Sequence, residues 1–229
     1  MTPHDPITDP AGIDTAEVPL RPWEGAAFMA TGAALVVHIV VDVPLWLSVA
    51  VAATAAGCVI ALAVHRHPGG TRAGRRVITV GTASAVAALV AYDGTRLAIS
   101  TGLGYEVGPF DAFRHFGAGL VGSSASNAAR WTAGTLFHIT NGITFGIAYT
   151  IVAGRRGVVA GVLFGLGLEA AMIAFYPAWL QIPNLREFVS MSIVGHAVYG
   201  AVLGVAAQHG LRRFERAGDD DRATTVEGH

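Results

Sequence analysis

The chain has 229 residues, of which 52% are hydrophobic and 14% charged, with a mean hydropathy of +0.51 and a net charge near −1. A soluble domain carries about 25% charged residues, so this chain has too few to cover a water-facing surface and we expect a membrane protein. Its charge gives no electrostatic basis for binding nucleic acid, and the single Cys58 excludes a disulfide framework or a multi-cysteine metal site.

The predicted transmembrane domain covers residues 23–216 and lies between two tails. Residues 1–22 are acidic and rich in proline, without the basic segment of a signal peptide, and we expect them to be disordered. A disordered tail is also predicted at 217–229. A transmembrane helix needs about 20 apolar residues. Six stretches meet this requirement, at 25–43, 45–65, 77–100, 132–152, 157–178 and 187–208.

The sequence therefore predicts an all-α fold, a polytopic membrane helix bundle with six transmembrane helices. Arginines gather in the loop after the second helix, in the turn after the fourth and at the end of the sixth, which predicts that both termini are cytoplasmic. All 15 basic residues are arginine, and this lysine-free composition, rich in Ala, Gly and Arg, is typical of a bacterium with a GC-rich genome. We expect a multi-pass protein of the inner (plasma) membrane, with membrane lipid as a partner.

The longest segment on the predicted outer side runs from Thr101 to Arg130. Its core, PFDAFRHFGAGLVG, begins with a proline and an aspartate that suit a helix N-terminus. Phe110, Phe113 and Phe116 recur about every three residues. This pattern indicates a short interfacial or re-entrant helix over the bundle, or an ordered loop with aromatic anchors, and the sequence leaves both open.

Two predicted helices carry the same pattern, H-x-x-x-G-x-x-x-G, which begins at His138 in the fourth helix and at His196 in the sixth. Spacings of four place these residues on one helix face, and glycines four apart allow close helix packing in lipid. The preceding helices each carry an acid, Asp93 in the third and Glu169 in the fifth. This order predicts a tandem two-helix repeat, with halves at about 77–152 and 157–208.

Depth along the helices, at about 1.5 Å per residue, places the two acids and the two histidines together in the outer half of the bundle. An ionised carboxylate in a membrane is costly and needs a partner. Asp93 has Arg96 three residues later, and an ion pair between them is the favoured interpretation. Glu169 has no basic residue within four positions, so we expect its partner on another helix, His138 or His196.

These four residues allow several kinds of site. Imidazole and carboxylate ligands suit Fe, Mn or Zn, so Asp93, His138, Glu169 and His196 are candidate metal ligands. A haem held by both histidines, a proton- or substrate-binding site without metal, and a purely structural hydrogen-bonded network are the alternatives. The same four residues are the candidate catalytic groups. Candidate substrate-binding residues are Arg96, Asn141, Tyr176 and Tyr199.

The segments AYDGTRLAI, HITNGITFGIAY, GLGLEAAMIAFYP and GHAVYGAVLG, which span roughly residues 77–208, resemble uncharacterised bacterial multi-pass membrane proteins of the YagU-like kind. That resemblance implies the multi-pass fold. It adds no catalytic residue, because these families have no assigned activity.

Three functions fit these observations. The first is a membrane enzyme, with or without a metal, that acts on a lipophilic substrate from the outer leaflet. Its acid–base groups would be Glu169, Asp93, His138 and His196. The second is a proton- or cation-coupled transporter, because intramembrane acids and histidines are common proton relays. The third is an assembly or accessory protein whose polar residues hold the helices together. The enzyme ranks first.

Overall fold

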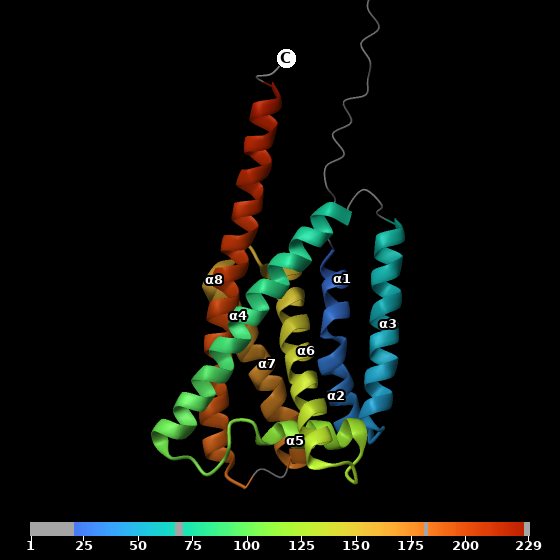
Figure 1. Ribbon diagram of the computed structural model, residues 1–229, viewed down its shortest axis with the longest axis vertical. Helices are drawn as coiled ribbons and strands as arrows, with labels where there is room; N and C mark the ends of the chain where they lie inside the picture. The colour runs from blue at the N-terminus through green and yellow to red at the C-terminus, as the bar shows by residue number, and fades with distance from the viewer. Residues whose placement is uncertain (1–20, 67–70, 181–182, 227–229) are drawn as a thin grey trace, which may run out of the picture.

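The computed structural model describes residues 21–66, 71–180 and 183–226, and all regular structure in these ranges is helical (Figure 1). Six segments are long and apolar enough to cross a membrane, which confirms the predicted all-α polytopic bundle. Residues 1–20 of the tail predicted at 1–22 lie outside the described residues, and Pro22 belongs to the first helix. The elements are α1 (Pro22–Ala26), the 3₁₀ turn η1 (Ala27–Met29), α2 (Ala30–Val41), α3 (Leu45–Arg66), α4 (Thr71–Leu103), α5 (Asp111–Val121), α6 (Asn127–Ala153), α7 (Gly157–Leu180) and α8 (Leu185–Val226).

The first two spans form a hairpin. Together α1, η1 and α2 make the first span, and α3 makes the second. The chain reverses at Asp42, which has a left-handed backbone (φ 58°) and donates its N–H to the carbonyl oxygen of His38 at 3.0 Å. Pro44 follows directly before α3 and supplies the fixed φ that suits a helix start.

The last helix is longer than a membrane span requires. α8 runs to Val226 and projects beyond the other helices (Figure 1). The structure is therefore helical over residues 217–226, where the sequence analysis expects a disordered tail, and residues 227–229 lie outside the described range. Residues 212–217 (RRFERA) contain arginine, glutamate and alanine, which favour helices, so the helix continues as it leaves the bundle.

The segment between α4 and α6 contains a helix, so the alternative of a loop is wrong. This helix, α5, lies across the end of the bundle, nearly perpendicular to the spans (Figure 1). It crosses α6 at two glycines: a Cβ at Gly117 would clash with the carbonyl oxygen of Arg130, and a Cβ at Gly134 would clash with that of Phe113. Glycine at both positions therefore allows the two backbones to touch.

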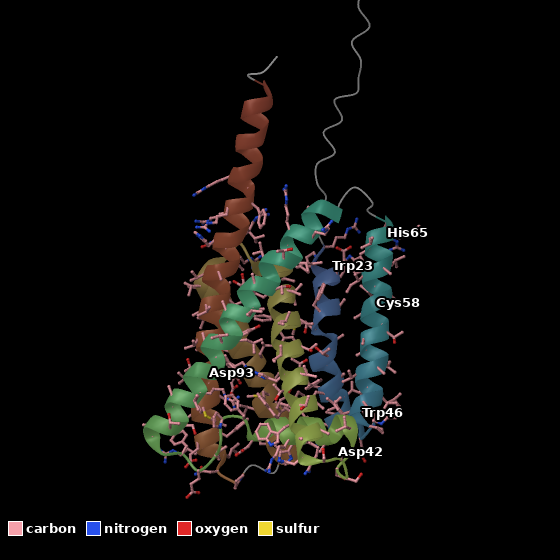
Figure 2. All side chains as sticks on the ribbon, viewed as in Figure 1. Trp23, Asp42, Trp46, Cys58, His65 and Asp93 are labelled. Carbon is pink, nitrogen blue, oxygen red and sulfur yellow. The ribbon has the colours of Figure 1, made fainter. Side chains whose placement is uncertain are left out.

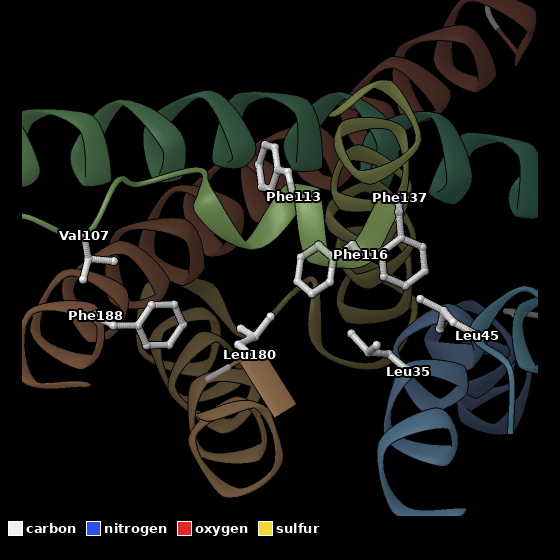
Figure 3. Packing of buried hydrophobic residues seen from close by; sticks show 8 residues of the cluster. All are labelled: Leu35, Leu45, Val107, Phe113, Phe116, Phe137, Leu180 and Phe188. Carbon is white, nitrogen blue, oxygen red and sulfur yellow. The ribbon is translucent and has the colours of Figure 1, made fainter. Parts of the chain in front are cut away.

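Two clusters of buried side chains form the core. One lies at the end of the bundle that α5 covers and gathers Leu35, Leu45, Val107, Phe113, Phe116, Phe137, Leu180 and Phe188 (Figure 3). The second lies deeper, where α4, α6 and α8 meet, and contains Ala88, Leu89, Tyr92, Tyr149, Tyr199, Leu203 and Ala207. Two of the residues predicted from the sequence belong to these regions, since Tyr199 is part of the second cluster and Tyr176 packs against the first.

Candidate functional site

Each acid-bearing helix packs against the histidine-bearing helix that follows it in the chain, α4 against α6 and α7 against α8. In the first pair, a Cβ at Gly142 would clash with the Leu89 side chain, and one at Gly146 would clash with Ala85. Positions four apart on α6 thus face positions four apart on α4, as an antiparallel helix pair requires. One further step of four residues in this register brings His138 opposite Asp93.

The α7–α8 pair is packed more tightly, backbone against backbone. A Cβ at Gly161 would clash with the Gly200 carbonyl oxygen, and a Cβ at Gly165 would clash with that of His196. One turn beyond Gly165 lies Glu169. The two glycine faces therefore position each histidine against the carboxylate of the acid-bearing helix that it packs against, α4 for α6 and α7 for α8.

The first pair joins Asp93 and His138. Nε2 of His138 donates to both carboxylate oxygens of Asp93, at 3.1 and 3.2 Å. The predicted ion pair between Asp93 and Arg96 is wrong: the ion pair that Asp93 forms among the described residues is the one with His138. Helix geometry explains the outcome, since the α4–α6 register turns Asp93 toward α6, whereas Arg96 contacts Gly195 of α8.

The second pair joins Glu169 and His196 and is the more buried of the two. Nδ1 of His196 lies 2.7 Å from Oε2 of Glu169, and Ser192 donates its hydroxyl to the same oxygen at 2.7 Å. The Glu169 side chain is 3% exposed, against 29% for Asp93. His196, one of the two partners that the sequence predicts for Glu169, is thus the one that the structure places there.

An aromatic ring contacts both histidines. The ring centroid of Tyr92 lies 5.8 Å from that of His138 and 4.8 Å from that of His196. Tyr92 lies at the centre of the α4–α6–α8 cluster and its side chain is buried. The two acid–histidine pairs are therefore neighbours across one tyrosine, rather than two isolated contacts.

Both histidines line a cavity of about 100 Å³, which we call the central cavity. Its apolar wall comes from α5, α6, α7 and α8 and includes Phe113, Phe116, Phe145, Leu168, Met172 and Phe188. Its polar wall consists of Tyr92, Arg96, His138, Asn141, Tyr176, His196 and Tyr199. The structure thus brings six of the eight predicted site residues to one cavity, and it pairs the other two, Asp93 and Glu169, with its histidines.

Several polar atoms at this site have no partner. Nε of Arg96, Oδ1 of Asn141 and Oε1 of Glu169 are buried without a hydrogen bond to any described residue. Tyr199 is satisfied, because its hydroxyl donates to the carbonyl oxygen of Gly142 at 2.7 Å. Buried polar atoms in folded proteins are nearly always paired, so unpaired atoms grouped around a cavity indicate a place where a ligand or water supplies the partners.

The arrangement gives no support to a metal centre made from all four acid and histidine residues. Among the described residues, no three His, Cys, Asp or Glu side chains lie close enough together to hold a metal ion. The two acid–histidine pairs lie on either side of Tyr92, so their four side chains do not converge on one point as the ligands of one metal ion would. The central cavity is also too small to admit a haem between His138 and His196.

Tyr92 and Ser192, which contact the two acid–histidine pairs, are not among the site residues predicted from the sequence. Ser192 lies four residues before His196, a spacing that places both on the same helix face and could have indicated their proximity. Phe113 and Phe116 of α5 close the cavity. Their spacing of three residues predicted a helix but not a place in the site. Their position over the histidines depends on how α5 crosses α6, and this crossing cannot be predicted from the sequence pattern.

The fold defines the class to which the protein belongs: it is a multi-pass α-helical membrane protein with a cavity, part apolar and part polar, in one half of its bundle. No protein-family model matches the chain, and neither a curated protein nor a solved structure shows a significant similarity to it. The YagU-like resemblance therefore stays a prediction from the sequence.

Proposed function

We propose that the protein is a membrane enzyme that binds a small lipophilic molecule in the central cavity and transfers protons to and from it. The observation that supports this most directly is that two histidines line one cavity while a carboxylate holds one ring nitrogen of each. In such a pair the carboxylate fixes the orientation of the imidazole and stabilises its charged form. The other ring nitrogens, His138 Nδ1 and His196 Nε2, form no hydrogen bond with a described residue and are free to meet a ligand.

The two pairs differ in their surroundings, which suits two roles. Glu169 is almost fully enclosed, whereas Asp93 is partly accessible. Acid–base catalysis on one substrate needs one group that donates a proton and one that accepts it. Glu169 with His196 and Asp93 with His138 would act as these two groups.

A location in the outer half of the membrane fits a substrate that arrives from the lipid. In Figure 2, Asp93 lies in the half of the bundle that contains Asp42 and Trp46, far from His65 at the opposite end. The arginine distribution predicts that this half faces the outer side of the membrane. Toward the other side of the membrane the helices are closely packed. A Cβ added at Gly146, Gly161 or Gly200 would clash with the neighbouring helix.

This close packing and the unpaired atoms weigh against the two alternatives. A transporter requires a polar route through the other half, where the described helices meet through glycine and alanine. A purely structural network is expected to satisfy its own polar atoms, but Arg96, Asn141 and Glu169 each leave one unsatisfied.

Proton transfer at carbon can be detected without knowing the substrate. Purified protein in lipid nanodiscs would be incubated with a total bacterial lipid extract in D₂O, and every lipid would then be measured by mass spectrometry. We expect one lipid class to gain deuterium or change mass. Because acid–base groups contribute about 10²–10⁴-fold to rate, Glu169→Gln should slow the change by at least about 100-fold.

The matched control is Glu215→Gln, which makes the same chemical change at an exposed residue that pairs with Arg155 outside the cavity. It should leave the rate unchanged. A second variant, His138→Gln, tests the other pair in case Glu169→Gln lowers the yield of folded protein. The proposal is wrong if the wild type changes no lipid, or if both cavity variants react at the wild-type rate.

A further inference from the structure

Arg96 is a buried cation that has no carboxylate partner among the described residues. The residue is 4% exposed, and its guanidinium carbon lies 5.1 Å from the ring centroid of Tyr92. Its Nε has no hydrogen bond to any described residue, and the carboxylate of Asp93 is directed to His138 instead. A charge removed from water without a counter-charge is costly in a membrane, so its presence indicates that an anion occupies this position at some stage.

A second cavity of about 260 Å³, which we call the outer cavity, lies on the other side of Arg96. It shares Arg96, Ala112, Leu180 and Phe188 with the central cavity. Arg96 therefore lies where the two cavities adjoin. Most of the residues that line the outer cavity come from α5 and from the segments just before α5 and α8, and single residues of α4, α7 and α8 complete it, which places it at the end of the bundle.

The charges around the outer cavity favour an anion. Arg114 and His115, both on α5, line it together with Arg96. The acid in its wall, Asp111, is already used within its own turn, because its Oδ2 accepts the backbone N–H of Gly108 at 2.8 Å. A ligand that passes from the outer surface toward Arg96 thus meets basic side chains and one carboxylate that is engaged by the backbone.

We infer that the substrate is an amphiphile with an anionic head group, which enters through the outer cavity and is bound by Arg96 while its apolar part occupies the central cavity. This inference rests on the proposed function. The planar guanidinium group matches the geometry of a carboxylate or a phosphate, which are the two head groups that share this chemistry. Phe113, Phe116 and Met172 supply apolar contacts beside the two histidines.

Photolabelling tests the inference through binding alone. The probes are octanoic acid that carries a diazirine near the end of its chain and the corresponding alcohol, applied to protein in nanodiscs of phosphatidylcholine. Labelled residues are located by peptide mass spectrometry. We expect the acid to label the peptides of Phe113, Phe116 or Met172 at least about 10-fold more efficiently than the alcohol, because hydrogen bonds to a charged group are worth a factor of about 10–100 in affinity.

Arg96→Met removes the charge and keeps an apolar side chain of similar length. It should reduce labelling by the acid about 10- to 100-fold and leave labelling by the alcohol unchanged. Arg96→Lys keeps the positive charge but lacks the paired N–H groups of the guanidinium. It should therefore retain part of the preference for the acid probe over the alcohol. The control is Arg186→Met, at an exposed arginine of α8 that lines neither cavity, and it should label as the wild type does.

Competition on the wild-type protein keeps the test decisive if the Arg96 variants fold poorly. Octanoate, octyl phosphate and octanol would be added in excess over the acid probe. Stronger competition by octanoate identifies a carboxylate, and stronger competition by octyl phosphate identifies a phosphate head group. Equal competition by all three, or equal labelling by acid and alcohol, overturns the inference.

The two proposals fail in different ways. Selective labelling by the acid without any change in the lipid extract would leave the anion site standing and contradict the enzyme. Deuterium exchange into a neutral lipid, with no preference for the acid probe, would contradict the anion site and leave the enzyme standing.

Discussion

The contact between α7 and α8 makes a quantitative prediction about a single methyl group. A Cβ added at Gly161 would clash with the carbonyl oxygen of Gly200 and would lie 2.9 Å from Cα of Gly204, about 0.5 Å inside the 3.4 Å at which ordinary contact begins. The atoms in its way are backbone atoms, which cannot rotate aside as a side chain can. Gly161→Ala must therefore push the two helices apart.

The magnitude follows from two opposing effects. Alanine is favoured over glycine within a helix by about 1 kcal/mol, whereas forcing a methyl group into a packed interface costs typically about 1–3 kcal/mol and sometimes more. For a chain of this size, 1 kcal/mol changes the unfolding temperature by about 2–4 °C. The net cost is therefore about 0–2 kcal/mol, equivalent to a fall of up to about 8 °C. Because the added methyl group meets backbone atoms, we expect Gly161→Ala to lie in the upper half of that range, at about 4–8 °C.

The matched control is Gly167→Ala in the same helix, where an added Cβ meets no atom within 4 Å. It retains the helix gain without the clash, so its unfolding temperature should equal or exceed that of the wild type by about 2–4 °C. Thermal unfolding in detergent, followed by tryptophan fluorescence, measures both variants. If Gly161→Ala were as stable as Gly167→Ala, the α7–α8 contact described above would be wrong.

Three further predictions concern other contacts. Gly117→Ala should lower the unfolding temperature by several degrees in the same assay, because its methyl group would meet the α6 backbone where α5 crosses; Gly94→Ala, which meets nothing within 4 Å, should not. Tyr199→Phe should destabilise the fold by about 0.5–1.5 kcal/mol, measured by reversible unfolding in mixed micelles, through loss of one hydrogen bond to α6; no loss would show that the bond is not formed. Asp93→Asn and His138→Gln should be non-additive in that measurement, with a coupling of about 0.5–3 kcal/mol, and additive effects would contradict their contact.

The transmembrane helices could be predicted from the sequence because each depends on a local property. A span needs about 20 apolar residues, and each of the six predicted stretches overlaps one spanning segment of the structure, such as 45–65 for Leu45–Arg66. The ends are less predictable. The third helix extends from the predicted 77–100 to Thr71–Leu103, because helical hydrogen bonding continues into polar residues that carry no apolar signal.

The site could be predicted in part, and the division has a physical reason. Spacing along a helix is fixed, so the helix faces that carry His138 and His196 could be predicted. Glu169 has no basic residue within four positions, so its need for a partner on another helix could also be predicted. Which neighbour a side chain meets depends on how helices rotate against each other. For this reason the sequence analysis assigned Asp93 to Arg96, three residues away on the same helix, whereas the structure pairs it with α6.

In the structure, the motif H-x-x-x-G-x-x-x-G has two roles: its glycines allow close helix packing, and its histidine meets the carboxylate of the neighbouring helix. In both α6 and α8 the two glycines lie on the face that contacts the acid-bearing helix, α4 or α7, and the histidine lies one turn further along the same face. Because an antiparallel pair keeps its register over successive turns, close approach at the glycines determines where the imidazole meets the acid helix. Asp93 and Glu169 both occur at that point. The glycines therefore act on the site as well as on stability, since a helix pair held further apart would leave each carboxylate in the membrane without its histidine.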